Sequence, residues 1–244
     1  MKVLVIGANG ATGTHVVGQL LKNDKKVEVK AMMRSADRAW AAWKDDPRVE
    51  IVEASINDLS VGDLKLIMDD CEAVVSTLGH NLTFKGVYQD PKRLVRDTVM
   101  KVCHAAELME EQDRVKVLLM NTNGNSNRKI KEKKPFMDRL VVGLVRLLLP
   151  PHADNEAAAD YLWQSEHKFK KVEWSVIRPD NLSDDENTSA YRCFESPVQS
   201  AIFTSIGTSR INVGDFMSQL ILDADAWNKW QGKMPVIYNS AKLN

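Results

Sequence analysis

The sequence predicts an α/β fold built on a doubly wound parallel sheet. Two observations support this prediction. Short apolar runs rich in β-branched residues alternate with amphipathic helical patterns along the chain. The first run, residues 3–6, ends at a glycine-rich turn that leads directly into a helix. The composition, with 44% hydrophobic and 27% charged residues among 244, is typical of a globular protein that can bury a core.

The alternation of strands and helices continues to about Pro179. Right-handed crossovers then place the strands in one parallel sheet. We expect a single domain over residues 1–244, in which residues from about 180 to 244 form a small substrate-side lobe on the same sheet. The predicted strands are residues 3–6, 27–33, 49–53, 73–78, 115–120 and 173–177, and the helices include residues 59–68, capped by Asp58 or Ser60, and 91–110.

Charge and cysteine content narrow the class of protein. Lys and Arg total 33 and so do Asp and Glu, so the net charge is zero, which argues against nucleic-acid binding. Cys71, Cys103 and Cys193 form no CxxC pair and are expected to be reduced thiols in a cytoplasmic protein. The apolar stretch 136–149 is too short for a transmembrane helix, which needs about 20 residues. We expect it to be buried or to contact a partner, including a second copy of the chain. The histidines lack metal-ligand spacing.

A glycine motif follows the first strand. In Gly7-Ala8-Asn9-Gly10-Ala11-Thr12-Gly13, the first glycine allows a tight turn and the second allows a phosphate to approach the backbone. The third lets the following helix pack close to the strand, and the helix N-terminus offers N–H groups and partial positive charge to a pyrophosphate. The motif therefore predicts dinucleotide binding by Gly7, Asn9, Gly10, Ala11, Thr12 and Gly13.

The end of the second strand indicates which dinucleotide binds. An acidic residue there usually bonds the ribose 2′-hydroxyl of NAD, whereas this chain has Arg34. A guanidinium suits a 2′-phosphate, so we predict NADP(H), held by Arg34 with help from Ser35 and Arg38. Two alternatives remain open: both arginines are solvated surface charges, or Asp37 binds the ribose.

Ligands of such sheets lie beyond the carboxyl ends of the strands. This rule places further candidate residues at the mouth of the site. We predict cofactor contacts from Ser55, Leu78, Gly79, Asn121, Pro179, Asn181 and Leu182, and place Thr122 at the same edge. His80 is either a catalytic proton donor or a loop histidine that contacts solvent or a cofactor phosphate.

The glycine motif and Arg34 resemble the atypical short-chain dehydrogenase/reductase group. The same resemblance extends to Ser76-Thr77-Leu78-Gly79, Asn121-Thr122-Asn123-Gly124 and the run from Trp174 to Leu182. The likeness is greatest to its NAD(P)-binding, NmrA-like and biliverdin/flavin-reductase-like branches. The resemblance implies a Rossmann sheet of about seven strands. It also implies that Thr122 stands where the family has a catalytic Ser or Thr, and that residues 178–182 close over the nicotinamide.

The chain departs from this family at the tyrosine that usually acts as the general acid. The usual Tyr-x-x-x-Lys pair should lie on the helix after Thr122, but Tyr161 is followed four places later by Ser165. Such a spacing from Tyr88 to Lys92 comes after the fourth strand and is interpreted as coincidence. His152 could replace the tyrosine, although a simple helix-start role is favoured.

The missing pair favours hydride transfer to an acceptor that depends mainly on positioning. We therefore predict an NADPH-dependent reductase of a conjugated small molecule such as a flavin, quinone or tetrapyrrole-like compound. The alternatives are a non-catalytic NADP(H) sensor and an epimerase or isomerase with bound NAD(P). The basic run 128–134 attracts an anion or is a solvated loop.

Overall fold

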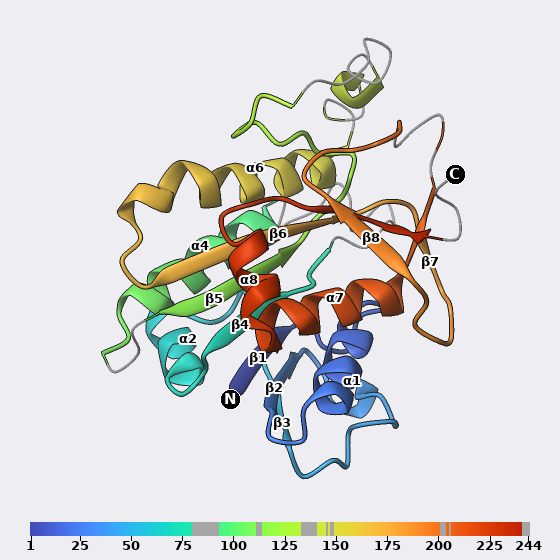
Figure 1. The fold of residues 1–244 in the computed structure, drawn as a ribbon. Helices are drawn as coiled ribbons and strands as arrows, with labels where there is room; N and C mark the ends of the chain where they lie inside the picture. The colour runs from blue at the N-terminus through green and yellow to red at the C-terminus, as the bar shows by residue number, and fades with distance from the viewer. Residues whose placement is uncertain are drawn as a thin grey trace.

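A parallel sheet forms the centre of the computed structural model, which describes residues 1–79, 93–110, 114–132, 141–144, 146, 149–200, 204 and 206–240 (Figure 1). Within these residues the sheet has eight strands in the order β3-β2-β1-β4-β5-β6-β10-β8. The strands are β1 (Lys2–Ile6), β2 (Glu28–Met33), β3 (Val49–Glu53), β4 (Ala73–Ser76), β5 (Val115–Met120), β6 (Val172–Pro179), β8 (Tyr191–Phe194) and β10 (Val236–Asn239).

This topology confirms the predicted doubly wound α/β fold. The strand order reverses at β1, which pairs in parallel with β2 on one side and with β4 on the other. All neighbours are parallel except β8, which runs antiparallel to β10 at the sheet edge. The sequence predicts six of these strands individually, β1 to β6, but not β8 or β10, which lie in the segment expected to form a small substrate-side lobe on the same sheet.

Helices cover both faces of the sheet and enclose two apolar cores. Leu4 and Ile6 of β1 point to the face covered by α2 (Val61–Met68), α4 (Leu94–Glu107) and α6 (Pro150–Ser165). Val3 and Val5 point to the opposite face, covered by α1 (Gly13–Asn23), α7 (Arg210–Leu222) and α8 (Ala224–Trp230). This period-two alternation, repeated along buried strands, explains why the strands read as continuous apolar runs.

The C-terminal segment contributes to both the sheet and its rim. Strands β8 and β10 extend the sheet, and α7 packs against α1. Strand β7 (Leu182–Ser183) pairs in parallel with β9 (Thr208–Ser209) to form a separate two-stranded sheet beside the carboxyl end of β6. Short 3-10 helices occur at Ala36–Arg38 and Glu166–Lys168.

Polar caps fix the ends of two helices on the same face. Ser60 caps α2, since its hydroxyl accepts from the Asp63 N–H at 3.1 Å and the Asp63 carboxylate accepts from the Ser60 N–H, which resolves the choice between Asp58 and Ser60. The buried carboxylate of Asp154, on α6, accepts from the N–H groups of Val95 and Arg96 at 2.8 and 3.1 Å. Helix α6 therefore caps the start of α4.

A buried ion pair joins β6 to the loop that follows β5. The Arg178 guanidinium donates to both carboxylate oxygens of Glu132 at 2.9 Å, and both side chains are 1% exposed. Its remaining N–H groups donate to the carbonyls of Asn125, Met234 and Glu195. All five donors are satisfied, so one side chain ties together four segments of the chain.

Glu132→Gln should lower the free energy of unfolding by about 3–5 kcal/mol, because it leaves the buried Arg178 charge without its carboxylate. Urea unfolding of the variant measures this loss. The control is Glu195→Gln in the neighbouring ion pair with Lys233, where the Glu195 side chain is 61% exposed. That variant should stay within about 0.5 kcal/mol of the wild type. Equal losses in both variants would show that the Arg178–Glu132 pair has no special role.

Helix α1 begins where Gly13 meets the backbone of Gly7. A Cβ on Gly13 would overlap the Gly7 carbonyl group and lie 2.9 Å from the Thr77 hydroxyl oxygen. Gly18, in the same helix, has room for a Cβ, since the nearest heavy atom would be a Trp40 ring carbon at 3.8 Å.

We predict opposite effects of alanine at these two helix positions. Gly13→Ala should destabilise the fold by about 1–3 kcal/mol, because backbone atoms must move to admit the methyl group. Gly18→Ala should stabilise it by about 0.5–1 kcal/mol, since alanine restricts the unfolded chain. Thermal unfolding compares the two directly, and a stable Gly13→Ala variant would contradict the close approach.

Candidate functional site

The loop between β1 and α1 has the geometry of a phosphate cradle. Gly7 has a φ of +84°, a conformation that side chains disfavour, and its carbonyl accepts from the Gly10 N–H at 2.9 Å. Among the described residues, no backbone carbonyl accepts from the N–H groups of Ala11, Thr12 and Gly13. These donors lie at the positive end of α1, and the glycines of the loop have no side chains to fill the space beside them. The loop therefore fits a pyrophosphate.

The residues after β2 and β3 form the next part of this edge. Arg34 and Arg38 are exposed, Ser35 is half-buried, and neither arginine forms an ion pair with another described residue. The Glu53 carboxylate, at the end of β3, accepts from the Ala36 N–H at 2.8 Å and thereby holds the turn that carries them. Two cationic groups thus stand beside the glycine loop without a described carboxylate partner.

The end of β4 lies directly against the same loop. The Thr77 hydroxyl is 3.2 Å from the carbonyl oxygens of Ile6 and Gly7, and the Leu78 side chain borders Gly7. Gly79 is exposed, and a Cβ added to it would meet no described atom within 4 Å, while Ser55 is half-buried after β3. His80 and the Tyr88–Lys92 pair lie outside the described residues, so the predicted role of His80 stays a prediction.

A cavity of about 410 Å³ opens at the carboxyl ends of β5 and β6. This volume is in the range of small-molecule sites. It brings together five residues that the strand-end rule selected, which are Asn121, Thr122, Pro179, Asn181 and Leu182, and adds Asn123, Gly124, Val141, Val142, His152 and Asp180.

The loop after β5 lines this cavity with four consecutive residues, Asn121 to Gly124. Asn121, Asn123, Asn125 and Asn127 are all buried. Asn121 accepts from the Thr122 N–H at 2.8 Å and donates to the Asn155 carbonyl at 2.8 Å, which fixes the loop to α6. Asn121 therefore holds this loop in place in the cavity wall, with the Thr122 hydroxyl beside it.

His152 is the residue that sequence reasoning undervalued. Its position near the start of α6 favoured a purely structural role, but its side chain lines the cavity. Its Nε2 atom lies 3.9 Å from the Glu156 Oε1 atom, one helical turn later. The spacing of four residues to a glutamate was the available signal, although it could not show that the ring faces a cavity.

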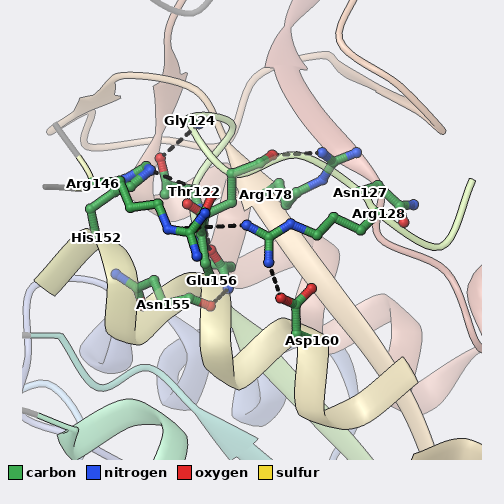
Figure 2. A network of polar contacts seen from close by, with 12 residues as sticks. Thr122, Gly124, Asn127, Arg128, Arg146, His152, Asn155, Glu156, Asp160 and Arg178 are labelled. Atoms are coloured by element: carbon green, nitrogen blue, oxygen red, sulfur yellow. Dashed lines mark hydrogen bonds and ion pairs between the residues drawn. The ribbon is translucent and has the colours of Figure 1, made fainter. Parts of the chain in front are cut away.

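Arg128, the first cation of the basic run 128–134, is held by α6 (Figure 2), and Lys133 and Lys134 of that run lie outside the described residues. Arg128 forms ion pairs with Asp160 and with Glu156, the latter at 3.0 Å. Lys129 pairs with Glu166 at 2.6 Å and lies over the ring of Trp174. These first two cations hold the loop against the helix, which leaves neither as an unpaired attractor for an anion.

Tyr161 does not substitute for the family tyrosine. Its ring packs against Phe169 at 6.1 Å between centroids, within the core on the α4 and α6 face. Burial raises the pKa of Tyr161 to about 12, which disfavours proton transfer at neutral pH. The helix after β5 therefore presents His152, and not this tyrosine, to the cavity.

The described residues lack the features of two other kinds of site. In this part of the chain, no group of three or more His, Cys, Asp or Glu side chains is placed to hold a metal ion. No helix built from these residues is long and apolar enough to cross a membrane. The three cysteines are free, and burial raises the pKa of the Cys71 thiol to about 12.

Comparisons with known proteins agree with this geometry. An uncharacterized chloroplastic protein of Arabidopsis thaliana is 38% identical over 78 residues, which cover 32% of this chain and 27% of that relative. The oxidoreductase ylbE of Lactococcus lactis superposes with a TM-score of 0.69 at 15% identity, over 98% of this chain and 91% of that one. A short-chain dehydrogenase/reductase of Veillonella parvula, in complex with NADP, gives 0.70 at 14% identity, over 100% and 96%.

The structural neighbours share the fold, in agreement with the resemblance to atypical short-chain dehydrogenases/reductases. The model of one protein family, described as NAD(P)H-binding, matches residues 7–224 and so includes both the glycine loop and the cavity. The chain belongs to this NAD(P)H-binding family and has a Rossmann fold.

Proposed function

We propose that the protein is an NADPH-dependent oxidoreductase that reduces a conjugated small molecule such as a flavin, quinone or tetrapyrrole-like compound. The observation that carries this proposal is the position of two features on one edge of the sheet. The phosphate cradle follows β1, and the 410 Å³ cavity follows β5 and β6. A dinucleotide laid along this edge would reach from one to the other.

Different residues on this edge would bind different parts of the cofactor. Asn9 and the backbone of residues 10–13 would hold the pyrophosphate, while Ser55, Leu78 and Gly79 border the adenosine and ribose region. Asn121, Pro179, Asn181 and Leu182 would frame the nicotinamide. When bound, NADPH supplies a hydride, and the chain's contribution is to hold the acceptor against the nicotinamide and to exclude water.

The preference for NADPH over NADH rests on Arg34. Its guanidinium is exposed at the end of β2 and has no ion-pair partner among the described residues. Arg38 stands on the adjoining 3-10 helix, and Glu53 is engaged with the Ala36 N–H. The 2′-phosphate of NADPH would form ion pairs with these two cations, whereas the ribose of NADH carries no negative charge that could bind them.

The alternatives are less well supported by the same residues. An epimerase must oxidise and re-reduce an alcohol, for which α6 offers no Tyr-x-x-x-Lys pair. A purely sensing role needs no open substrate cavity beside the nicotinamide position. The cavity therefore favours a reductase over the sensor, and the missing pair on α6 favours it over the epimerase.

Arg34→Glu should weaken NADPH binding by roughly 10²-fold or more, because a carboxylate replaces the cation facing the phosphate. NADH affinity should change by less than about threefold. Isothermal titration calorimetry measures both. The matched control is Lys25→Glu, an exposed charge reversal just beyond the far end of α1, which should leave both affinities unchanged. A similar loss for NADPH and NADH would contradict the NADP assignment.

Reductase activity is tested by mixing the protein and NADPH with flavins, quinones and tetrapyrroles and following nicotinamide absorbance. The proposal expects NADPH oxidation with at least one of these acceptor classes. Tight NADPH binding with no turnover across the panel would instead support the sensor.

A further inference from the structure

Thr122 and His152 border one small space inside the cavity. A Cβ added to Gly124 would lie 3.3 Å from the His152 Cε1 atom and 3.5 Å from the Thr122 hydroxyl oxygen. The absence of a side chain at Gly124 therefore leaves a gap between a hydroxyl and an imidazole. Both groups reach this gap from rigid elements, since Thr122 follows β5 and His152 stands on the first turn of α6.

The hydroxyl of Thr122 is oriented by its own loop. Its oxygen accepts from the Gly124 N–H at 3.2 Å, and the Thr122 N–H donates to Asn121. Because a hydroxyl both accepts and donates, its hydrogen can point to an acceptor atom in the gap.

The imidazole of His152 is held from the other side by Glu156. The His152 side chain is 11% exposed and that of Glu156 is 8% exposed, with Nε2 and Oε1 separated by 3.9 Å. A carboxylate at this distance favours the protonated ring and restrains its orientation. The arrangement is a histidine–glutamate pair in the wall of a cavity (Figure 2).

Other charged groups balance the carboxylate. Arg128 and Arg146 both reach the Glu156 Oε2 atom at 3.0 Å, and Asp160 pairs with Arg128. On the β6 side, the buried Asp180 lines the cavity while its carboxylate accepts from the N–H groups of Ile206 and Gly207 at 2.8 and 3.1 Å. The carboxylate beside the ring is thus itself opposed by two cations.

We propose that His152 is a catalytic residue that protonates an oxygen of the acceptor, with Glu156 as its positioning residue and Thr122 as a hydrogen-bond donor to the same oxygen. This inference rests on the proposed function and narrows the acceptor to a quinone or another conjugated carbonyl compound. A hydroxyl and an imidazole that border one gap suit a single carbonyl oxygen.

The proposed reaction balances with NADPH and one proton. A hydride adds two electrons to the conjugated carbon system, and the electron pair of the carbonyl π bond moves to its oxygen. That oxygen forms an O–H bond with the proton of the His152 imidazolium, whose N–H bond breaks. The products are the reduced acceptor, NADP⁺ and a neutral imidazole, which regains a proton from water.

The first test needs no cofactor. The chain has five histidines, and the His152 ring resonance is assigned by its loss in His152→Asn. An NMR pH titration of the protein alone then gives the midpoint of this ring. Removing the carboxylate in Glu156→Gln should lower the midpoint by about 0.5–1 pH unit, and Glu156→Asp should restore part of it. Removing an opposing cation in Arg146→Gln should raise it.

Arg146 is 55% exposed, so its variant remains informative if Glu156→Gln fails to fold. A His152 midpoint that is the same in the wild type and in the Glu156 and Arg146 variants would overturn the positioning role of Glu156, since a merely structural network would leave the titration of the ring unaffected.

The second test follows quinone reduction by the full-length protein. His152→Asn should lower kcat/KM by roughly 10²–10⁴-fold with little change in NADPH affinity. Wild-type kcat/KM should fall as pH rises through the His152 midpoint, because only the protonated ring is an acid, and this dependence should vanish in the variant. Gly124→Ala should also slow the reaction by filling the gap, while Gly143→Ala, whose Cβ meets nothing within 4 Å, should not.

Different results would overturn the proposed reductase function and the proposed role of His152. Equal quinone reduction by wild type and His152→Asn at every pH would overturn the role of His152 and leave the reductase standing. Tight NADPH binding without turnover of any acceptor in the wild type would overturn the proposed function and the catalytic role with it.

Discussion

The buried ion pair between Arg178 and Glu132 is the interaction on which the shape of the site depends. Isolated charges are costly to bury, and this pair is tolerated because the carboxylate takes two hydrogen bonds and three carbonyls take the remaining donors. One of these carbonyls belongs to Asn125, in the loop that carries Thr122 and Gly124. Arg178 itself directly precedes Pro179, at the start of the opposite cavity wall. The pair therefore sets the separation of the two walls.

A second constraint comes from backbone contact at the other end of the same sheet edge. Gly13 lets the start of α1 approach the Gly7 carbonyl within a distance that no side chain permits, and Gly7 takes the positive φ that the turn needs. The consequence is a row of N–H groups at a helix N-terminus that no described backbone carbonyl accepts from. Steric requirements at one end and a charged pair at the other thus organise a single edge, which accounts for the fit to an extended dinucleotide.

Local sequence signals predicted most of the fold. Strands β1 to β6 and the helices between them were recognisable because buried parallel strands are apolar runs and the helices carry apolar faces. The cavity residues Thr122, Asn121 and Pro179 followed from topology alone, since carboxyl ends of parallel strands share one edge. Strands β8 and β10 were missed because each has only four residues and follows the last predicted strand, outside the regular alternation of strands and helices. His152 and the ion pairs of Arg128 depend on how α6 lies against the loop after β5, which no local pattern encodes.

We propose that one bound NADP⁺ spans the edge from the glycine loop to the cavity between Thr122 and Pro179. A crystal structure of the protein with NADP⁺ tests this binding mode. We expect pyrophosphate oxygens on the N–H groups of residues 11–13, the 2′-phosphate within hydrogen-bond distance of Arg34, and the nicotinamide ring inside the cavity. A nicotinamide outside that cavity, or a 2′-phosphate that does not contact Arg34, would contradict this binding mode.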